Sequence, residues 1–316
     1  MSASHPSVTL IDCQYTAPEK AAVYMIVEGE RVAFVDNNTN QAIPLFLAAL
    51  EEKGLTPAQV DYLIVTHIHL DHAGGTAALL KLCPNATVLA HPKAARHLID
   101  PSRLVAGAKM VYGDEEFDTL YGRIDGVPEG RIRVMQDEES LTWGTRTFRF
   151  FFTRGHASHH FCIHDTGSDG VFAGDAFGLA RMSTARPGIS FTLCSSSPPE
   201  FEPDEARISV QKILDTGASR AFITHFGQFD DLEVRARHLL HSIDQLETIG
   251  RAAAASHFNG DTLFEFCNDE VRKATIAHLA WCDVENPEVD MAWLDGDLFL
   301  NALGLRFYAE RLRFEE

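Results

Sequence analysis

The sequence predicts an α/β protein with strands and helices in two successive halves, followed by a helical tail. Three observations carry this prediction. Short apolar segments rich in β-branched residues alternate with stretches of helical spacing. This plan begins again at about residue 147 with a new series of strands. From about Leu232 to the end, the apolar residues follow a helical pattern alone.

The first half opens with a predicted hairpin, because segments 24–27 and 32–35 flank a turn at Gly29. A helical pattern over 42–53 stops at Gly54, a residue type that often ends helices. The further elements expected in this half are a buried strand at 62–66, a helix at 76–82, a strand at 87–90, a helix at 92–99 and a helical segment at 101–121 broken at Gly113.

The second half is predicted to contain strands at 147–153, 160–164 and 170–173, a helix at about 205–215 and a strand at 220–224. No sequence repeat relates it to the first half. The tail is either a helical appendage or an outer layer of the main domain, and the sequence leaves both open.

Composition restricts the function classes. The 316 residues are 45% hydrophobic and 23% charged, as in ordinary globular proteins. A net charge of −18 without a basic patch disfavours a nucleic-acid partner. There is no apolar run of roughly 18 residues and no secretion signal at the N-terminus, so we expect a cytoplasmic protein without a membrane partner. The six scattered cysteines are expected to be reduced thiols.

The segment T-H-I-H-L-D-H-A-G-G, residues 66–75, carries the chemistry. It begins where a predicted buried strand ends, which is where ligands gather in sheet proteins. His67 and His69 point to the same side in strand geometry and can share one metal. Asp71 and His72 follow at the turn and can face a second metal, while two glycines permit a tight turn.

Three later residues also follow apolar strands: His156 in T-R-G-H-A-S-H-H, Asp175 in F-A-G-D-A-F and His225 in I-T-H-F-G. Each alone is an ordinary polar residue at a strand end. Together with the histidine-rich run they predict a metal centre. Imidazole and carboxylate ligands suit zinc and also accept iron or manganese.

In these motifs the sequence resembles the metallo-β-lactamase superfamily, in its binuclear glyoxalase-II-like branch, over roughly residues 8–235. The resemblance implies an αββα four-layer sandwich as a catalytic domain at 1–235, with a helical C-terminal extension at 236–316. It also implies two divalent metal ions and a metal-bridging hydroxide as nucleophile. His67, His69 and His156 would bind one metal, Asp71, His72 and His225 the other, with Asp175 bridging both and Asp71 orienting the hydroxide.

Departures from the family motifs narrow the function. The stretch 178–186 lacks the C-G-[KR] glutathione element of glyoxalase II and of the persulfide dioxygenases. Gly178 stands where acyl-homoserine-lactone lactonases have a tyrosine, and flavodiiron proteins have glutamate where this chain has His69. Segments 91–104 and 195–203 resemble a glyoxalase-like subgroup, and that resemblance brings no substrate with it.

The sequence therefore predicts hydrolysis of a small ester, thioester or lactone. Two alternatives stay open: a mononuclear-iron redox enzyme like the persulfide dioxygenases, and a small-molecule phosphodiesterase. A binding protein that has lost its chemistry is disfavoured, since all seven ligands are present. A homodimer is compatible with the sequence.

Further residues are candidates near the metals. His160, four residues after His156, is expected to support the metal ligands from outside the coordination sphere. Specificity is expected from segments 102–121 and 178–203 laid over the groove. The candidates for substrate contact are Tyr112, Tyr121, Arg181, Arg186 and Phe191. The two arginines predict an anionic substrate.

Overall fold

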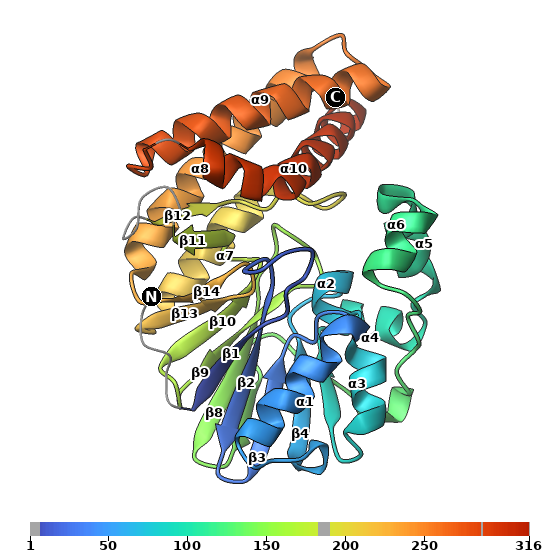
Figure 1. Ribbon diagram of the computed structural model, residues 1–316. Coiled ribbons are helices and arrows are strands. Elements are labelled where there is room, and N and C mark those ends of the chain that lie inside the picture. The colour runs from blue at the N-terminus through green and yellow to red at the C-terminus, as the bar shows by residue number, and fades with distance from the viewer. Residues whose placement is uncertain (1–6, 183–189, 286, 316) are drawn as a thin grey trace.

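A computed structural model describes residues 7–182, 190–285 and 287–315. Two six-stranded sheets face each other, with helices on both outer faces, as Figure 1 shows. The architecture is the predicted αββα sandwich with a helical C-terminal extension.

The first sheet has the strand order β1-β2-β3-β4-β5-β6. β1 to β3 pair antiparallel, and β3 to β6 pair parallel. The parallel arrangement places the carboxyl ends of β3, β4 and β5 at one edge. The bounds are β1 Val8–Asp12, β2 Ala22–Glu28, β3 Arg31–Val35, β4 Val60–Val65, β5 Thr87–Ala90 and β6 Ile132–Val134.

The second sheet has the order β14-β13-β10-β9-β8-β7. β10 and β13 pair parallel, and the other neighbours pair antiparallel. The bounds are β7 Ser140–Trp143, β8 Arg146–Phe152, β9 Phe161–Asp165, β10 Gly170–Gly174, β13 Arg220–Ile223 and β14 Gly227–Phe229.

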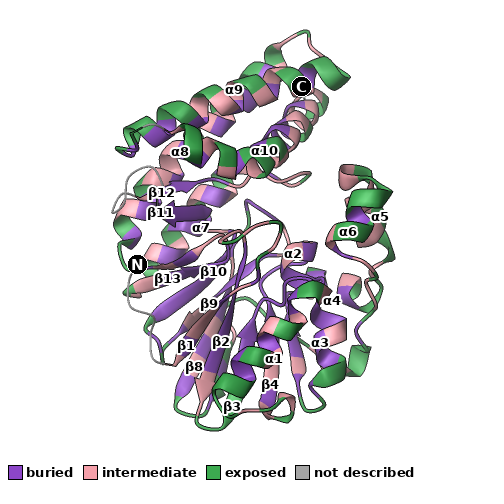
Figure 2. Ribbon diagram, in the orientation of Figure 1, coloured by how far each residue is buried: buried purple, intermediate pink, exposed green. Residues whose placement is uncertain are grey.

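Alternation along the strands builds the layers, because successive side chains point to opposite faces. In β2, Tyr24 packs between the sheets against Phe172 and Phe222, whereas Val23 and Met25 join the outer core. The outer face of the first sheet is covered by α1 Ile43–Glu52, α3 Thr76–Leu82 and α4 Pro92–Ile99. Figure 2 shows the strands mostly buried beneath these helices.

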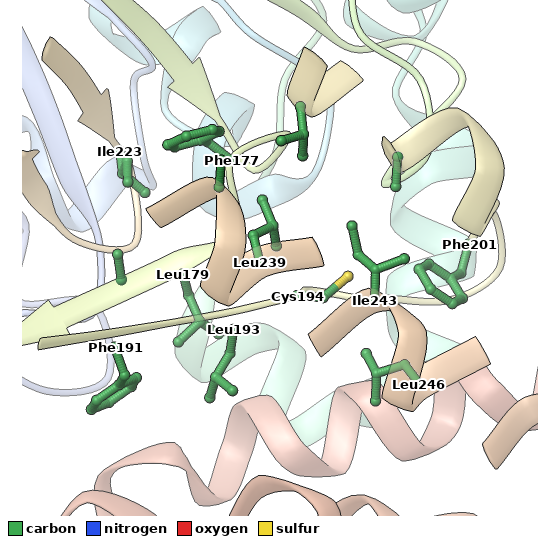
Figure 3. Close-up of a cluster of buried hydrophobic side chains, with 14 of the residues drawn as sticks. Phe177, Leu179, Phe191, Leu193, Cys194, Phe201, Ile223, Leu239, Ile243 and Leu246 are labelled. Atoms are coloured by element: carbon green, nitrogen blue, oxygen red, sulfur yellow. The ribbon is translucent and has the colours of Figure 1, made fainter. Parts of the chain in front are cut away.

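The second sheet is covered by α7 Pro203–Asp215 and α8 Leu232–Ala255, and α9 Gly260–Trp281 and α10 Glu288–Glu315 pack on α8. One buried cluster continues from β10 and β13 through α8 into α10. Figure 3 shows Ile223 of the sheet and Leu239, Ile243 and Leu246 of α8 in this cluster. The boundary at residue 235 stays a prediction.

The predicted helix 101–121 is a pair, α5 Ser102–Tyr112 and α6 Asp114–Leu120, broken at Gly113 as expected. Segment 178–203 contains a small antiparallel sheet of β11 Leu179–Met182 and β12 Ser190–Leu193, and the sequence pattern predicts neither strand. The sequence did not predict β1, β6, β7 or β14, which are outer strands of the two sheets. The remaining short elements are α2 Leu70–Ala73, η1 Asn40–Ala42, η2 Pro57–Gln59 and η3 Glu129–Arg131.

Among the described residues, no helix combines the length and apolar character needed to cross a bilayer.

Candidate metal centre

The loop after β4 brings the first ligands together. His67 follows the strand directly and is fully buried, and its Nε2 lies 2.9 Å from Nδ1 of His69. His69 is the N-cap of the short helix α2, which carries Asp71 and His72. The predicted pairing of His67 with His69 on one side is thus present.

Two glycines allow this loop to pack against the segment after β3. A Cβ on Gly75 would lie 2.4 Å from the carbonyl oxygen of Asn37, and one on Gly74 would lie 2.5 Å from that of Leu70. Neither position tolerates a side chain without a shift of backbone. The close approach lets Asn38 Nδ2 donate to the carbonyl of Asp71 at 2.9 Å. This hydrogen bond holds segment 66–75, here called the metal loop, in place.

The first ligand group consists of His67, His69, His156 and Asp175, whose candidate ligand atoms lie within 4.8 Å of one another. His156 follows β8, and its Nε2 lies 3.0 Å from Nδ1 of His69 and 3.3 Å from Oδ2 of Asp175. A tetrahedral metal with nitrogen ligands at about 2.0–2.1 Å separates those ligand atoms by about 3.4 Å. The spacing of this group therefore fits one metal ion.

The second group consists of Asp71, His72 and His225. Nε2 of His225 lies 3.3 Å from Nε2 of His72 and 3.3 Å from Oδ2 of Asp71. Three ligand atoms from α2 and from the end of β13 thus converge at separations typical of metal ligands.

Asp175 stands between the two groups. Its Oδ2 faces His156, whereas its Oδ1 lies 3.2 Å from Nε2 of His72 and 3.5 Å from Nε2 of His225. Oδ1 is buried without a hydrogen-bond partner. A buried ionised oxygen is costly unless positive charge compensates it, and here it faces Nε2 of His72 and His225, which can hold either protons or a metal ion. The residues of each group therefore fit a divalent ion, and one oxygen of Asp175 faces each group.

In the first group the imidazoles are neutral. Burial, together with the neighbouring imidazoles, holds the pKa of His67 and of His69 well below the ordinary value of 6.5. Burial lowers the pKa of His156 as well. Neutral imidazole is the form that binds metals, so this group is ready to accept an ion without losing protons.

In the second group the pKa values of the histidines are raised instead of lowered. Burial alone would lower the pKa of His72 and His225, but the carboxylates of Asp175 and Asp71 outweigh it. The pKa of His72 is raised well above 6.5 and that of His225 to about 9. The same imidazoles hold the pKa of Asp71 and Asp175 below the ordinary carboxyl range, against the effect of burial. Without metal, this group compensates its carboxylates with protons.

Asp36, which follows β3, is a supporting residue that the sequence analysis missed. Its Oδ2 accepts a hydrogen bond from Nδ1 of His72 at 2.7 Å and from the Thr224 hydroxyl at 2.9 Å, and its Oδ1 accepts from the backbone of Thr66 at 2.9 Å. This fixes the His72 ring with Nε2 toward the metal. Its position at the end of an apolar strand, like that of Asp175, was the available signal.

The other ligands are held from outside in the same way. Nδ1 of His225 donates to the carbonyl of Lys20 at 2.6 Å, and Nδ1 of His156 lies 3.2 Å from the carbonyl of Ser195. His160 accepts from the backbone N–H of Asp175 at 3.1 Å through Nε2 and pairs with Thr153 through Nδ1 at 2.7 Å. It thus contacts the backbone of a ligand and lies where a supporting residue was expected.

His159 was also missed. Its ring is nearly parallel to that of His67, with the centroids 6.1 Å apart, and burial lowers its pKa to about 3. It therefore adds a neutral imidazole to the wall of the first group. The cluster of histidines at 156–160 was the signal for it.

Of the residues predicted to contact substrate, Tyr112 and Tyr121 lie beside the metal loop, in a cluster with Leu70 of α2. Tyr15, from the connection between β1 and β2, joins them and was not predicted. Its hydroxyl lies 2.6 Å from that of Tyr121, across 106 residues of sequence. Nothing local to Tyr15 signals this contact.

Arg181 lies in β11 with only 8% of its surface exposed, over the ring of Trp293 at 4.2 Å and 3.5 Å from Glu19. Phe191 is fully buried in the hydrophobic cluster beneath α8, as Figure 3 shows. Its side chain therefore contributes to this core. Arg186 lies outside the described residues.

Residues 17–210 match the family model described as the metallo-β-lactamase superfamily. This match covers more than half of the chain and contains six of the seven candidate ligands. The chain belongs to the metallo-β-lactamase superfamily. The seventh ligand, His225, follows the matched region and completes the second group.

Two curated relatives align with this superfamily member over about two thirds of their own length. Metallo-beta-lactamase fold-containing protein ST1585 from Sulfurisphaera tokodaii is 27% identical over 57% of this chain and 67% of its own. Glyoxylase B2 from Dictyostelium discoideum is 26% identical over 64% of this chain and 65% of its own, which is compatible with the glyoxalase-II-like branch.

Solved structures show the same fold along nearly the whole chain. The structure of ST1585 gives a TM-score of 0.63 at 19% identity and covers 95% of this chain and 98% of its own. The metallo-beta-lactamase family protein TTHA1429 from Thermus thermophilus gives 0.66 at 20% identity and covers 97% and 94%. At these identities the likeness establishes the fold alone.

Proposed function

We propose that the protein is a binuclear metal-dependent hydrolase that cleaves an ester, thioester or lactone of a small molecule. The observation that carries the proposal is Asp175, which directs one carboxylate oxygen to each of two histidine groups and leaves Oδ1 without a hydrogen bond. Zinc is the metal that we expect, because imidazole and carboxylate ligands suit it. The cytoplasm is the expected location.

Two divalent ions held here would supply an ionised water near neutral pH and polarise the carbonyl group of the substrate. The chain itself provides the orientation. The Asp71 side chain is 20% exposed, whereas His67, His72 and Asp175 are buried. Its carboxylate thus lies at the accessible side of the centre, where it can accept a hydrogen bond from the attacking water. The buried ligands exclude bulk solvent from the rest of the site.

The intact second group favours this reaction over a mononuclear redox enzyme. Asp71, His72 and His225 are preassembled, and Asp36 holds the His72 ring. A single-iron site would leave this group and one oxygen of Asp175 without a role. Hydrolysis of a small-molecule phosphodiester would use the same metals. Only an assay with phosphodiester substrates distinguishes it from hydrolysis of a carboxylic acid derivative.

The test is an assay of purified protein with counted metals against ester, thioester, lactone and phosphodiester panels. We expect turnover of a carboxylic acid derivative with about two metals per chain. Log kcat/KM should rise with unit slope on the acid side and level off at about pH 7–8. One tightly held iron with oxygen uptake, or turnover of phosphodiesters alone, would replace this proposal with the respective alternative.

A further inference from the structure

An apolar cluster from three segments packs directly on the metal loop. Leu70 lies between the ligands His69 and Asp71, and it is buried against Phe117 and Tyr121 of the α5–α6 region. Tyr15 and Tyr112 pack on the same cluster and are half-buried. One wall of the metal centre is therefore apolar, with tyrosine side chains at its surface.

The side chains of Tyr15, Tyr112 and Tyr121, here named the phenol cluster, pack against one another. The Tyr15 and Tyr121 hydroxyls are 2.6 Å apart and share a hydrogen bond. The Tyr112 and Tyr121 ring centroids are 5.8 Å apart. The three hydroxyls carry three protons, and the hydrogen bond between Tyr15 and Tyr121 uses one of them. The cluster therefore has more donors than this hydrogen bond uses.

The three phenols remain protonated in the ordinary pH range. Burial and then the charge of Asp71 raise the pKa of Tyr112 to about 12, and burial raises the pKa of Tyr15 and Tyr121 further. The charge of Asp297 also acts on Tyr15 and Tyr112. Protonated phenols are hydrogen-bond donors, and the apolar side chains packed around them favour an uncharged acceptor, because an anion would lose its hydration there.

We propose that the phenol cluster is a substrate-binding site that donates a hydrogen bond to a neutral oxygen of the substrate, such as the carbonyl or ring oxygen of an ester or lactone with an apolar body. This inference rests on the proposed function, whose site it extends. Tyr15 and Tyr112 present the donor, because they are half-buried and Tyr121 beneath them is only 2% exposed. The half-buried Leu104 and Leu120 of the same cluster offer apolar contacts to an aliphatic or aryl group.

The test uses a probe that binds without being hydrolysed. Metal-loaded protein is titrated with the neutral ketone 4-phenylbutan-2-one, and Kd is compared between wild type, Tyr15→Phe, Tyr112→Phe and the double variant. Each single loss of a donor should raise Kd roughly 2- to 12-fold, as expected for one net hydrogen bond. The value of kcat/KM for methyl 3-phenylpropanoate should fall in parallel. The control is Tyr62→Phe, since Tyr62 packs on Trp143 in the sandwich core.

Unchanged ketone affinity in both phenylalanine variants would overturn the inference, and so would a wild type that does not bind the ketone. An equal loss in Tyr62→Phe would overturn it too, because the effect would then come from a general loosening of the fold. Ketone binding that depends on the phenols, with no hydrolysis of any panel substrate, would reject the proposed function and support the phenol site. Hydrolysis at the same rate in wild type and in the phenylalanine variants would reject the phenol site and support the proposed function.

Discussion

Single residues define the metal centre through shared contacts. Asp175 reaches both histidine groups, and His160 fixes its backbone through the N–H at 3.1 Å. Asp175 therefore offers ligand atoms, whereas His160 holds Asp175 in place. Substitution of each should separate these roles.

Asp175→Ala should lower the metal content of purified protein below about two per chain and abolish turnover, since it removes an oxygen from each ligand group. His160→Ala should retain both metals at saturation and lower affinity or activity about 10- to 100-fold. Elemental analysis and a chelator titration measure both effects. Fully active wild type with one tightly held metal would contradict the two-metal arrangement.

Arg181 supports the prediction of an anionic group on the substrate. Its Nη2 lies 3.5 Å from Glu19, whereas its Nε and Nη1 are buried without a hydrogen-bond partner among the described residues. A buried guanidinium in that state favours a carboxylate or phosphate partner.

We expect wild type to prefer a dicarboxylic monoester over the corresponding neutral diester. Arg181→Gln should raise KM for the monoester and leave the diester almost unchanged. Equal losses on both substrates would mean that Arg181 only stabilises β11 against Trp293. Steady-state kinetics with the two esters decide between these outcomes.

At the scale of elements, α10 holds the segment that supports the second ligand group. Lys20 accepts from His225 Nδ1 through its carbonyl at 2.6 Å, and its ammonium group lies 2.7 Å from Asp297 and over the Trp293 ring at 3.8 Å. The Trp293 carbonyl also accepts from this ammonium. The C-terminal helix therefore reaches a metal ligand through one intervening residue.

Asp297→Ala should weaken binding of the second metal by up to about 10-fold, less than the loss of a direct partner, because Lys20 keeps its contacts to Trp293. The first metal should be unaffected. Competition with a chelator, read in two steps, measures both affinities. Asp295→Ala is the matched control, since Asp295 lies two residues away on α10 and, within the described part of the chain, pairs with Arg272 at the surface. Identical metal affinities in both variants would exclude this role of α10.

At the scale of the whole molecule, the C-terminal helices share one core with the second sheet, and His278 lies in it. This residue of α9 is fully buried, donates to the Thr192 carbonyl at 2.9 Å through Nε2 and lies 2.9 Å from Nδ1 of His241. Burial lowers its pKa to about 4 from an ordinary 6.5. His278 therefore binds a proton more weakly in the folded protein than in the unfolded chain.

The unfolded chain binds more protons than the native state between about pH 6.5 and pH 4, so this group costs stability as the pH falls through that window. The cost is absent above pH 6.5 and approaches about 3 kcal/mol near pH 4. His278→Gln should reduce the difference in unfolding free energy between pH 7 and pH 5, measured by urea unfolding of metal-saturated protein. An unchanged difference would contradict the burial argument.

The sequence by itself determined the two halves, most of the inner strands and the seven candidate ligands. These features are local: buried strands are continuous apolar runs, and each predicted ligand directly follows such a run or lies in the H-x-H-x-D-H segment. The strands that escaped prediction are outer strands, such as β6 and β14, or the β11–β12 pair. Three residues each in β6 and β14 give too little pattern to recognise.

Tertiary structure alone decided which residues surround the candidate metal ligands. Asp36 reaches His72 across 36 residues, and Tyr15 reaches Tyr121 across 106, because the order of strands in the sheets sets these contacts. Lys20 meets Asp297 across 277 residues. Burial also depends on the packed layers, so Phe191, expected in a substrate loop, instead packs in the core beneath α8. Local pattern identifies the groups that carry chemistry, and long-range packing sets their partners, orientation and charge.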